Sequence, residues 1–208
     1  CAERPTISMS AQDWSLPEPN MKHYTDDIMN EAKAFSDTAM VVLGRPGGEG
    51  ADLPTNMSAV INGTYNQGLA TSNAPANWRY MNATYTNNGS YDDFEEGESY
   101  LEPSVTEEQL IEKVCSEFDN VIVVINANNT MELGWVDNYE QIKSVILAPG
   151  AGETGFTALG EILNGTVNPS GKTADTYVKN LLSTHYINNI GTVSYTHLRA
   201  HETDSYLV

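Results

Sequence analysis

The chain has 208 residues, with 28 acidic and 10 basic side chains and a formal net charge of −18. This length suffices for one domain with a proper core, or for two very small ones. Nucleic acids and anionic membrane surfaces are bound through Lys and Arg, so the charge argues against both as partners and favours a neutral or cationic ligand. No apolar run approaches the roughly 20 residues that a membrane helix needs.

The chain opens without an initiator Met, and we interpret residues 1–25 as a truncated leading segment. No basic stretch followed by an apolar stretch is visible there, so we expect a cytoplasmic protein. A helix is predicted over residues 26–35, where apolar side chains recur at helical spacing and two acids stand in the first turn. A short, fully apolar strand is predicted over residues 37–44.

A glycine-rich loop follows this strand directly, in the sequence GRPGGEGAD over residues 44–52. Glycine serves where the backbone takes a positive φ or where another group approaches closely. The carboxylate of Glu49 among these glycines is therefore either a solvated turn acid or a group held toward a ligand.

The rest of the chain alternates strands and helices. Residues 53–100 are rich in Asn, Thr, Gly and Tyr and predict a long surface insertion. A capping box at 104–107 opens a predicted helix, apolar strands follow near 120–128 and 144–149, and a last helix ends at Gly165. This pattern predicts an α/β sandwich, a mostly parallel sheet with helices on both faces. Its ligand crevice would lie at the carboxyl ends of the strands, where three Gly- or Asn-rich loops converge.

Two phrases resemble the C-terminal-type α/β sandwich domain of family 3 glycoside hydrolases, the β-glucosidase group. They are the Gly-Glu-Gly-x-Asp core of the loop and the sequence GTVNPSGKTADT over residues 165–176. The resemblance extends over about residues 26–177, and we place the domain at 26–180 with the insertion at about 53–100. Two positions depart from the usual loop: Gly47 replaces a common serine, and Leu53 replaces a basic residue.

The resemblance implies a retaining β-glycosidase that needs no cofactor or metal. A (β/α)8 barrel, missing from this chain, would supply the nucleophile, and Glu49 would be the general acid/base. The substrate would be a β-linked glucoside or oligosaccharide. Arg45 and Asp52 are candidate substrate contacts, although Arg45 can instead pair with Glu49 or Asp52, and Asp52 can simply cap the loop. Trp135 either stacks on a sugar or packs in the core.

Residues 181–191 read as the start of a linker, and residues 192–208 do not continue the preceding pattern. Codons can be chosen so that residues 192–203 back-translate to the adapter of transposon-based sequencing libraries. We therefore interpret 192–208 as adapter read-through, and the i, i+4 pair His197 and His201 carries no weight as a metal site.

Two other classes of protein compete with this interpretation. A dinucleotide-binding module is disfavoured because the glycines do not follow the Gly-x-Gly-x-x-Gly spacing and an acid among them would repel a pyrophosphate. A non-catalytic carbohydrate-binding or scaffold domain is the more serious alternative, because this chain would hold only half of the active site.

Overall fold

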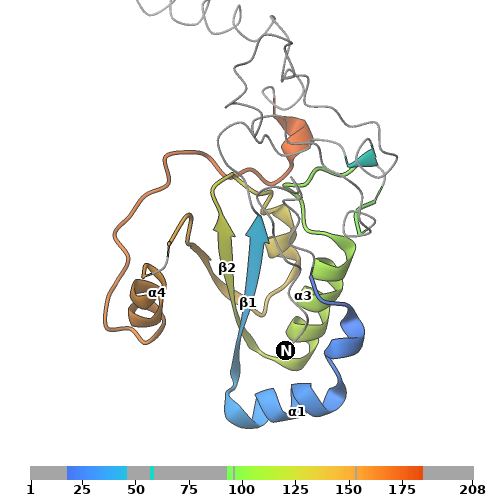
Figure 1. Cartoon of the computed structure of the whole chain (residues 1–208), viewed down its shortest axis with the longest axis vertical. Helices are drawn as coiled ribbons and strands as arrows, with labels where there is room; N and C mark the ends of the chain where they lie inside the picture. The colour runs from blue at the N-terminus through green and yellow to red at the C-terminus, as the bar shows by residue number, and fades with distance from the viewer. Residues whose placement is uncertain (1–17, 46–56, 59–92, 96, 153, 185–208) are drawn as a thin grey trace, which may run out of the picture.

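The computed structural model describes residues 18–45, 57–58, 93–95, 97–152 and 154–184, in which a small sheet lies among helices (Figure 1). The strands are β1 (Thr38–Arg45), β2 (Asn120–Ala127) and β3 (Ile142–Leu147). The α-helices are α1 (Asp26–Phe35), α3 (Val105–Glu117) and α4 (Phe156–Leu163). Short 3-10 helices are η1 (Met21–His23), η3 (Gly134–Asn138) and η4 (Leu181–Ser183).

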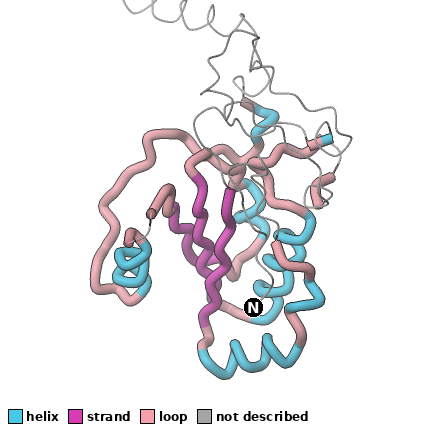
Figure 2. Tube along the Cα trace, in the orientation of Figure 1, coloured by secondary structure: helices cyan, strands magenta, loops and turns pink. Residues whose placement is uncertain are grey.

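The sheet has the strand order β1-β2-β3, and both neighbouring pairs are parallel. Figure 2 shows the strands in magenta, with α4 on one side of them and α3 on the other. Leu43 of β1 is in register with Ile125 of β2, which in turn pairs with Leu147 of β3. Parallel strands require crossover connections, and α3 lies in the connection between β1 and β2. The predicted α/β fold class with a parallel sheet is confirmed.

The two faces of β1 differ sharply in burial. Val41 and Leu43 are 4% and 0% exposed and belong to the hydrophobic core, whereas Met40 and Val42 on the opposite face are 50% and 45% exposed. The side chains that pack on the buried face come mainly from α3, with Met29 from α1. Helix α4 lies apart from α1 and α3 (Figure 1), and none of its residues is buried. Among the described residues, the second face of the sheet is therefore open at β1.

The helix boundaries follow local signals in the sequence. Thr25 caps α1 by accepting a hydrogen bond from the Ile28 amide at 3.4 Å. The capping box predicted at 104–107 is present at the start of α3. Gly165, at a φ of +77°, follows α4 where left-handed backbone favours glycine. Cys115 in α3 is buried, and burial raises the pKa of its thiol.

Several predicted segments lie outside the described residues. They are the leading segment up to residue 17, most of the insertion at 53–100, and residues 185–208, which include the predicted adapter-derived tail. In the part of the chain that the structure describes, every helix is too short or too polar to cross a bilayer.

Gly134 at the start of η3 lies directly against the segment that ends the described chain. A Cβ atom at this position would lie 2.0 Å from the carbonyl oxygen of Lys179. The neighbouring Leu133 amide donates to the Val178 carbonyl at 3.0 Å, which holds the two backbones together. The close approach therefore requires glycine at this position.

We predict that Gly134→Ala destabilises the chain by about 1–3 kcal/mol, because a backbone carbonyl cannot move aside as a flexible side chain would. Gly160→Ala is the matched control, since a Cβ atom there meets nothing within 4 Å and alanine favours a helix. Urea unfolding of both variants measures the difference. Equal stability of Gly134→Ala and the original chain would contradict the packing of 178–180 on η3.

Candidate active site at the carboxyl edge of the sheet

The three strands end side by side at one edge of the sheet. Arg45 at the end of β1 is in register with Ala127 at the end of β2, and β3 ends at Leu147 in the same direction. The loops after β2 and β3 also meet, because a Cβ atom on Gly150 would lie 3.0 Å from Oδ1 of Asn128. The predicted convergence of the loops on this edge holds for the two loops that the structure describes.

The structure describes one of the three predicted site residues, Arg45. Glu49 and Asp52 lie in residues 46–56, outside the described residues, so their roles stay predictions. Arg45 is described and is 4% exposed. It is the last residue of β1, so the first two residues of the predicted loop, Gly44 and Arg45, belong to the strand.

All five N–H groups of the Arg45 guanidinium are accounted for by protein acceptors. Nε donates to the Tyr100 carbonyl at 2.7 Å, and the two terminal nitrogens donate to the carbonyls of Gly44 and Glu102 at 2.8 Å each. The remaining two bonds form a fork to the carboxylate of Glu107, at 2.6 and 2.5 Å. This bidentate geometry is the strongest form of the Arg–carboxylate pair.

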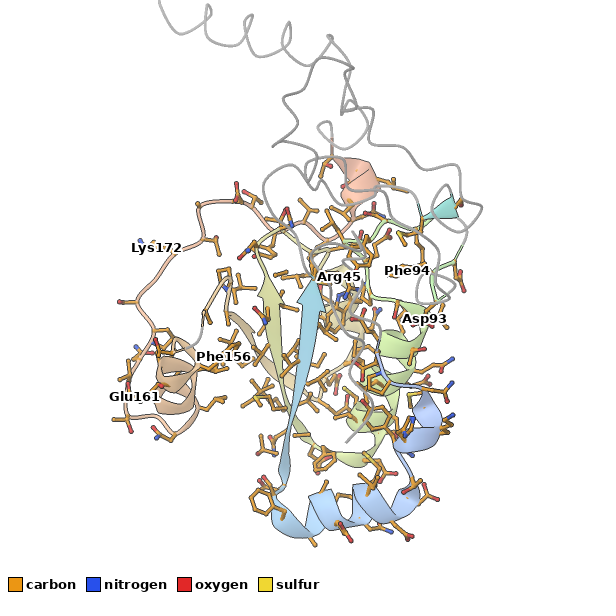
Figure 3. All side chains as sticks on the ribbon, in the orientation of Figure 1. Arg45, Asp93, Phe94, Phe156, Glu161 and Lys172 are labelled. Carbon is orange, nitrogen blue, oxygen red and sulfur yellow. The ribbon has the colours of Figure 1, made fainter. Side chains whose placement is uncertain are left out.

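Two aromatic rings complete the surroundings of Arg45, and Figure 3 labels one of them, Phe94, close to Arg45. The guanidinium carbon lies 5.0 Å from the ring centroid of Tyr100 and 5.8 Å from that of Phe94, within the range of cation–π attraction. The two rings are 5.5 Å apart and tilted by 48°. Both belong to the end of the predicted insertion, so Arg45 contacts the chain where it leaves β1 and again where it returns toward α3.

Glu107 has a second role at the start of α3. Its carboxylate accepts from the Ser104 amide at 2.8 Å, while Oγ of Ser104 accepts from the Glu107 amide at 3.3 Å. Asp93 accepts hydrogen bonds from the two amides between Ser104 and Glu107. The Val105 amide donates to the backbone carbonyl of Asp93 at 2.8 Å, and the Thr106 amide donates to its carboxylate at 3.1 Å. Two carboxylates at a helix N-terminus also complement the helix dipole. The first turn of α3 is therefore closed by protein groups.

The ion pair between Arg45 and Glu107 is buried on both sides, with side chains 2% and 4% exposed. Burial alone lowers the pKa of Arg45, but the hydrogen bonds and charge of Glu107 outweigh it and leave the pKa raised. Burying two charges is unfavourable unless their hydrogen bonds are satisfied. Here the donors of Arg45 are satisfied, so the pair can persist inside the protein.

These contacts bear on the predicted role of Arg45. The carboxylate that it binds among the described residues is Glu107, whereas the predicted alternatives, Glu49 and Asp52, lie outside them. A direct contact between Arg45 and substrate stays a prediction, and the use of all five donors by the protein weighs against it.

Trp135, for which sugar stacking and core packing were the two alternatives, packs in the core. It is 9% exposed, belongs to the core cluster, and donates its indole N–H to the Glu132 carbonyl at 2.9 Å. Glu132 in turn accepts from the Leu181 amide at 2.8 Å and so ties η4 to this region.

Sequence reasoning missed Asp93 and the ion pair of Glu107. Glu107 was identified only as part of the capping box, and Asp93 only as a residue of the predicted insertion at 53–100. The sequence analysis placed Arg45 in the loop after the predicted strand, whereas Arg45 is the buried last residue of β1, so its need for a buried acceptor was not apparent.

The chain matches a known protein family along most of its length. The family model of the Glycosyl hydrolase family 3 C-terminal domain matches residues 22–206. The chain therefore belongs to glycosyl hydrolase family 3, in which it corresponds to the C-terminal domain. The matched range takes in residues 192–206, whose origin from an adapter stays a prediction.

The chain is similar to three curated β-glucosidases. It is 30% identical over 156 residues to Beta-glucosidase A of Butyrivibrio fibrisolvens, which covers 75% of this chain and 16% of that protein. It is 38% identical over 92 residues to Thermostable beta-glucosidase B of Acetivibrio thermocellus, a match that covers 43% of this chain. It is 33% identical over 93 residues to Beta-glucosidase BoGH3A of Bacteroides ovatus, a match that covers 44% of this chain. It spans 12% of each of these two proteins.

A solved structure gives the same fold. The crystal structure of a β-glucosidase from Paenibacillus barengoltzii matches with a TM-score of 0.56 and 23% identity, over 86% of this chain and 14% of that one. The likeness supports the α/β fold of the domain.

The raised pKa values of three Glu side chains predict how the stability of the chain depends on pH. Burial is the main cause that raises the pKa of Glu102, helped by the charge of Glu132 and opposed by a hydrogen bond from the Ser99 amide. Burial likewise raises the pKa of Glu98 and Glu108, and neighbouring acids add to it. A carboxyl with a raised folded pKa contributes stability below its unfolded pKa and loses it as the pH rises through the folded value.

We therefore expect the urea midpoint of the chain to fall as the pH rises from about 4.5, the ordinary carboxyl pKa, toward neutrality. Glu102→Gln should make that fall smaller, because Gln keeps an acceptor for Ser99 without gaining a charge. Glu31→Gln removes one charge from the exposed face of α1 and is the control. Equal effects of the two variants would show that overall charge, and not burial at this edge, sets the pH dependence.

Proposed function

We infer that the chain is one domain of a retaining β-glycosidase of the β-glucosidase type, and that Glu49 is its general acid/base. The observation that carries the proposal is the position of Glu49 in a chain that belongs to glycosyl hydrolase family 3. Glu49 follows Arg45, the last residue of β1, by four residues in the sequence, and β1 ends at the carboxyl edge of a parallel sheet. In open α/β sheets ligands bind beyond this edge.

The proposed reaction needs a second carboxylate. Retaining enzymes place two carboxyl groups about 5–5.5 Å apart, one to attack the anomeric carbon and one to protonate the leaving oxygen. The nucleophile would come from a (β/α)8 barrel of the same parent protein. This fits the 16% of Beta-glucosidase A that the chain spans, which leaves most of that relative's length to other parts.

Glu49 suits the acid role for physical reasons. A loop with four glycines within residues 44–50 lets the carboxylate reach toward a neighbouring domain. Burial against that domain and the charge of the nucleophile would both raise its pKa toward the working range of a general acid. After the glycosyl–enzyme bond forms, the same carboxylate would act as the base that activates water.

The other predicted contacts have lesser roles in this proposal. Asp52 remains a candidate substrate contact in the same loop. Arg45 supports the site from within the domain, because its donors are already taken by the protein. The substrate class is a β-linked glucoside or oligosaccharide.

The isolated 208-residue chain should show negligible glycosidase activity, because a (β/α)8 barrel takes about 250 residues and its nucleophile would be missing. Release of nitrophenol from an aryl β-glucoside by the purified chain measures this. Hydrolysis above the background of a Glu49→Gln control would refute the division of the active site between two domains.

In the full-length enzyme, Glu49→Gln should lower kcat/KM by about 10²–10⁴-fold on oligosaccharides, whose leaving groups need a proton. Aryl glycosides with acidic leaving groups should keep their first step largely intact. Azide should partly rescue Glu49→Gly and give a β-glycosyl azide, because it attacks the glycosyl–enzyme bond without a base. A uniform loss on all substrates without an azide effect would point to a structural or non-catalytic role.

A further inference from the structure

Strand β1 forms one edge of the sheet, because among the described residues it pairs with β2 alone. In an edge strand every second residue directs its N–H and C=O groups away from the neighbouring strand, where another segment can pair with them. The strand has eight residues, and before Arg45 its sequence contains no Pro and no charged side chain of the kind that protects an exposed edge. The free edge of β1 is therefore open to strand pairing.

A groove with a volume of about 480 Å³ lies between β1 and α1, which crosses the foot of the strand (Figure 1). Helix α1 contributes Ile28, Ala32 and Phe35 to its lining. These residues follow one another at positions i, i+4 and i+7, so they form a single apolar stripe of the helix. The strand contributes Met40 and Val42, whose side chains point to the face of the sheet opposite the core.

The exposed apolar side chains of the described chain gather at this groove. Eight large apolar side chains are exposed in that part of the chain, and four of them line the groove: Ile28, Phe35, Met40 and Val42. Scattered apolar residues are normal on a surface, whereas a contiguous patch marks an interaction site. Parallel sheets also occur almost only where both faces are covered, and α3 covers only the core face of β1.

We propose that the groove between α1 and β1 is the docking surface for a further β-strand, contributed by another part of the parent protein. An extended segment can pair with the free edge of β1, whereas a helix bonds its own backbone and would leave that edge unpaired. One face of β1 packs in the core and the other is apolar and exposed. The docking segment is therefore a nearly continuous apolar run of about 5–6 residues, without a polar face.

Two observations favour the parent protein over a second copy of this chain as the source of the strand. The chain spans 16% of Beta-glucosidase A, so a parent of similar length has ample further chain to supply a strand. Each copy carries a formal charge of −18, and two such copies repel each other. The proposal concerns how the domain is completed, so it does not depend on the acid/base role of Glu49.

Cysteine labelling measures whether the groove is covered. Met40→Cys is introduced into the 208-residue chain and into the full-length parent, and its alkylation by iodoacetamide is followed by mass spectrometry of the peptide that contains it. We expect labelling at least about 10-fold slower in the parent, because a buried thiol is inert. Val167→Cys is the control, since Val167 is also exposed but lies outside the groove, and its labelling rates should be similar in both proteins.

Amide hydrogen exchange of the unsubstituted proteins is the second measurement. The amides of β1 that do not bond to β2 should exchange at least about 10-fold more slowly in the parent than in the 208-residue chain. Equal labelling and equal exchange in the two proteins would overturn the proposal. Slow labelling with unchanged exchange would also overturn it, because the cover would then not be a strand. Protection in the 208-residue chain that disappears on dilution would identify a second copy as the occupant and overturn it likewise.

Discussion

The buried ion pair between Arg45 and Glu107 is the constraint on which the arrangement of this domain depends. Its two side chains are 2% and 4% exposed, and charges in such a place are tolerated only when their hydrogen bonds are complete. The requirement brings the end of β1, the segment through Tyr100 and Glu102, and the first turn of α3 to one point. Asp93 extends the same network by binding the amides of α3 that Glu107 leaves free. The side chain of Arg45 therefore determines how the carboxyl edge of the sheet contacts the first turn of α3.

The rest of the fold explains why this edge carries the chemistry. In a parallel sheet the carboxyl ends of all strands lie at one edge. One face of β1 packs on α3, while Met40 and Val42 are exposed on the opposite face. The loops after β2 and β3 touch through Asn128 and Gly150, and Asn128 directly follows Ala127, the register partner of Arg45. Membership of glycosyl hydrolase family 3 gives this arrangement its proposed use, in which the domain contributes an acid/base group to a site shared with another domain.

The sequence predicted the elements better than the site. Helix α1 was predicted with its observed bounds, because capping and periodicity are local properties, whereas β3 begins two residues earlier than expected, since an isolated Ile-Lys pair carries no clear strand signal. The capping role of Glu107 was also local and was found. Its pairing with Arg45 joins residues 62 positions apart, and no local pattern encodes such a distance. Asp93 was missed for the same reason, because it lies in the predicted insertion and its partner Thr106 is 13 positions away.

A double-mutant cycle on the 208-residue chain tests the central role of the ion pair most directly. Arg45→Met and Glu107→Leu each leave an unpaired buried charge, which typically costs about 3–5 kcal/mol, whereas the double variant leaves none. Urea unfolding should therefore show the double variant to be less destabilised than the sum of the two single variants, by about 1–3 kcal/mol. Additivity of the two substitutions to within about 0.5 kcal/mol would contradict the account, because it would mean that the two side chains do not depend on each other.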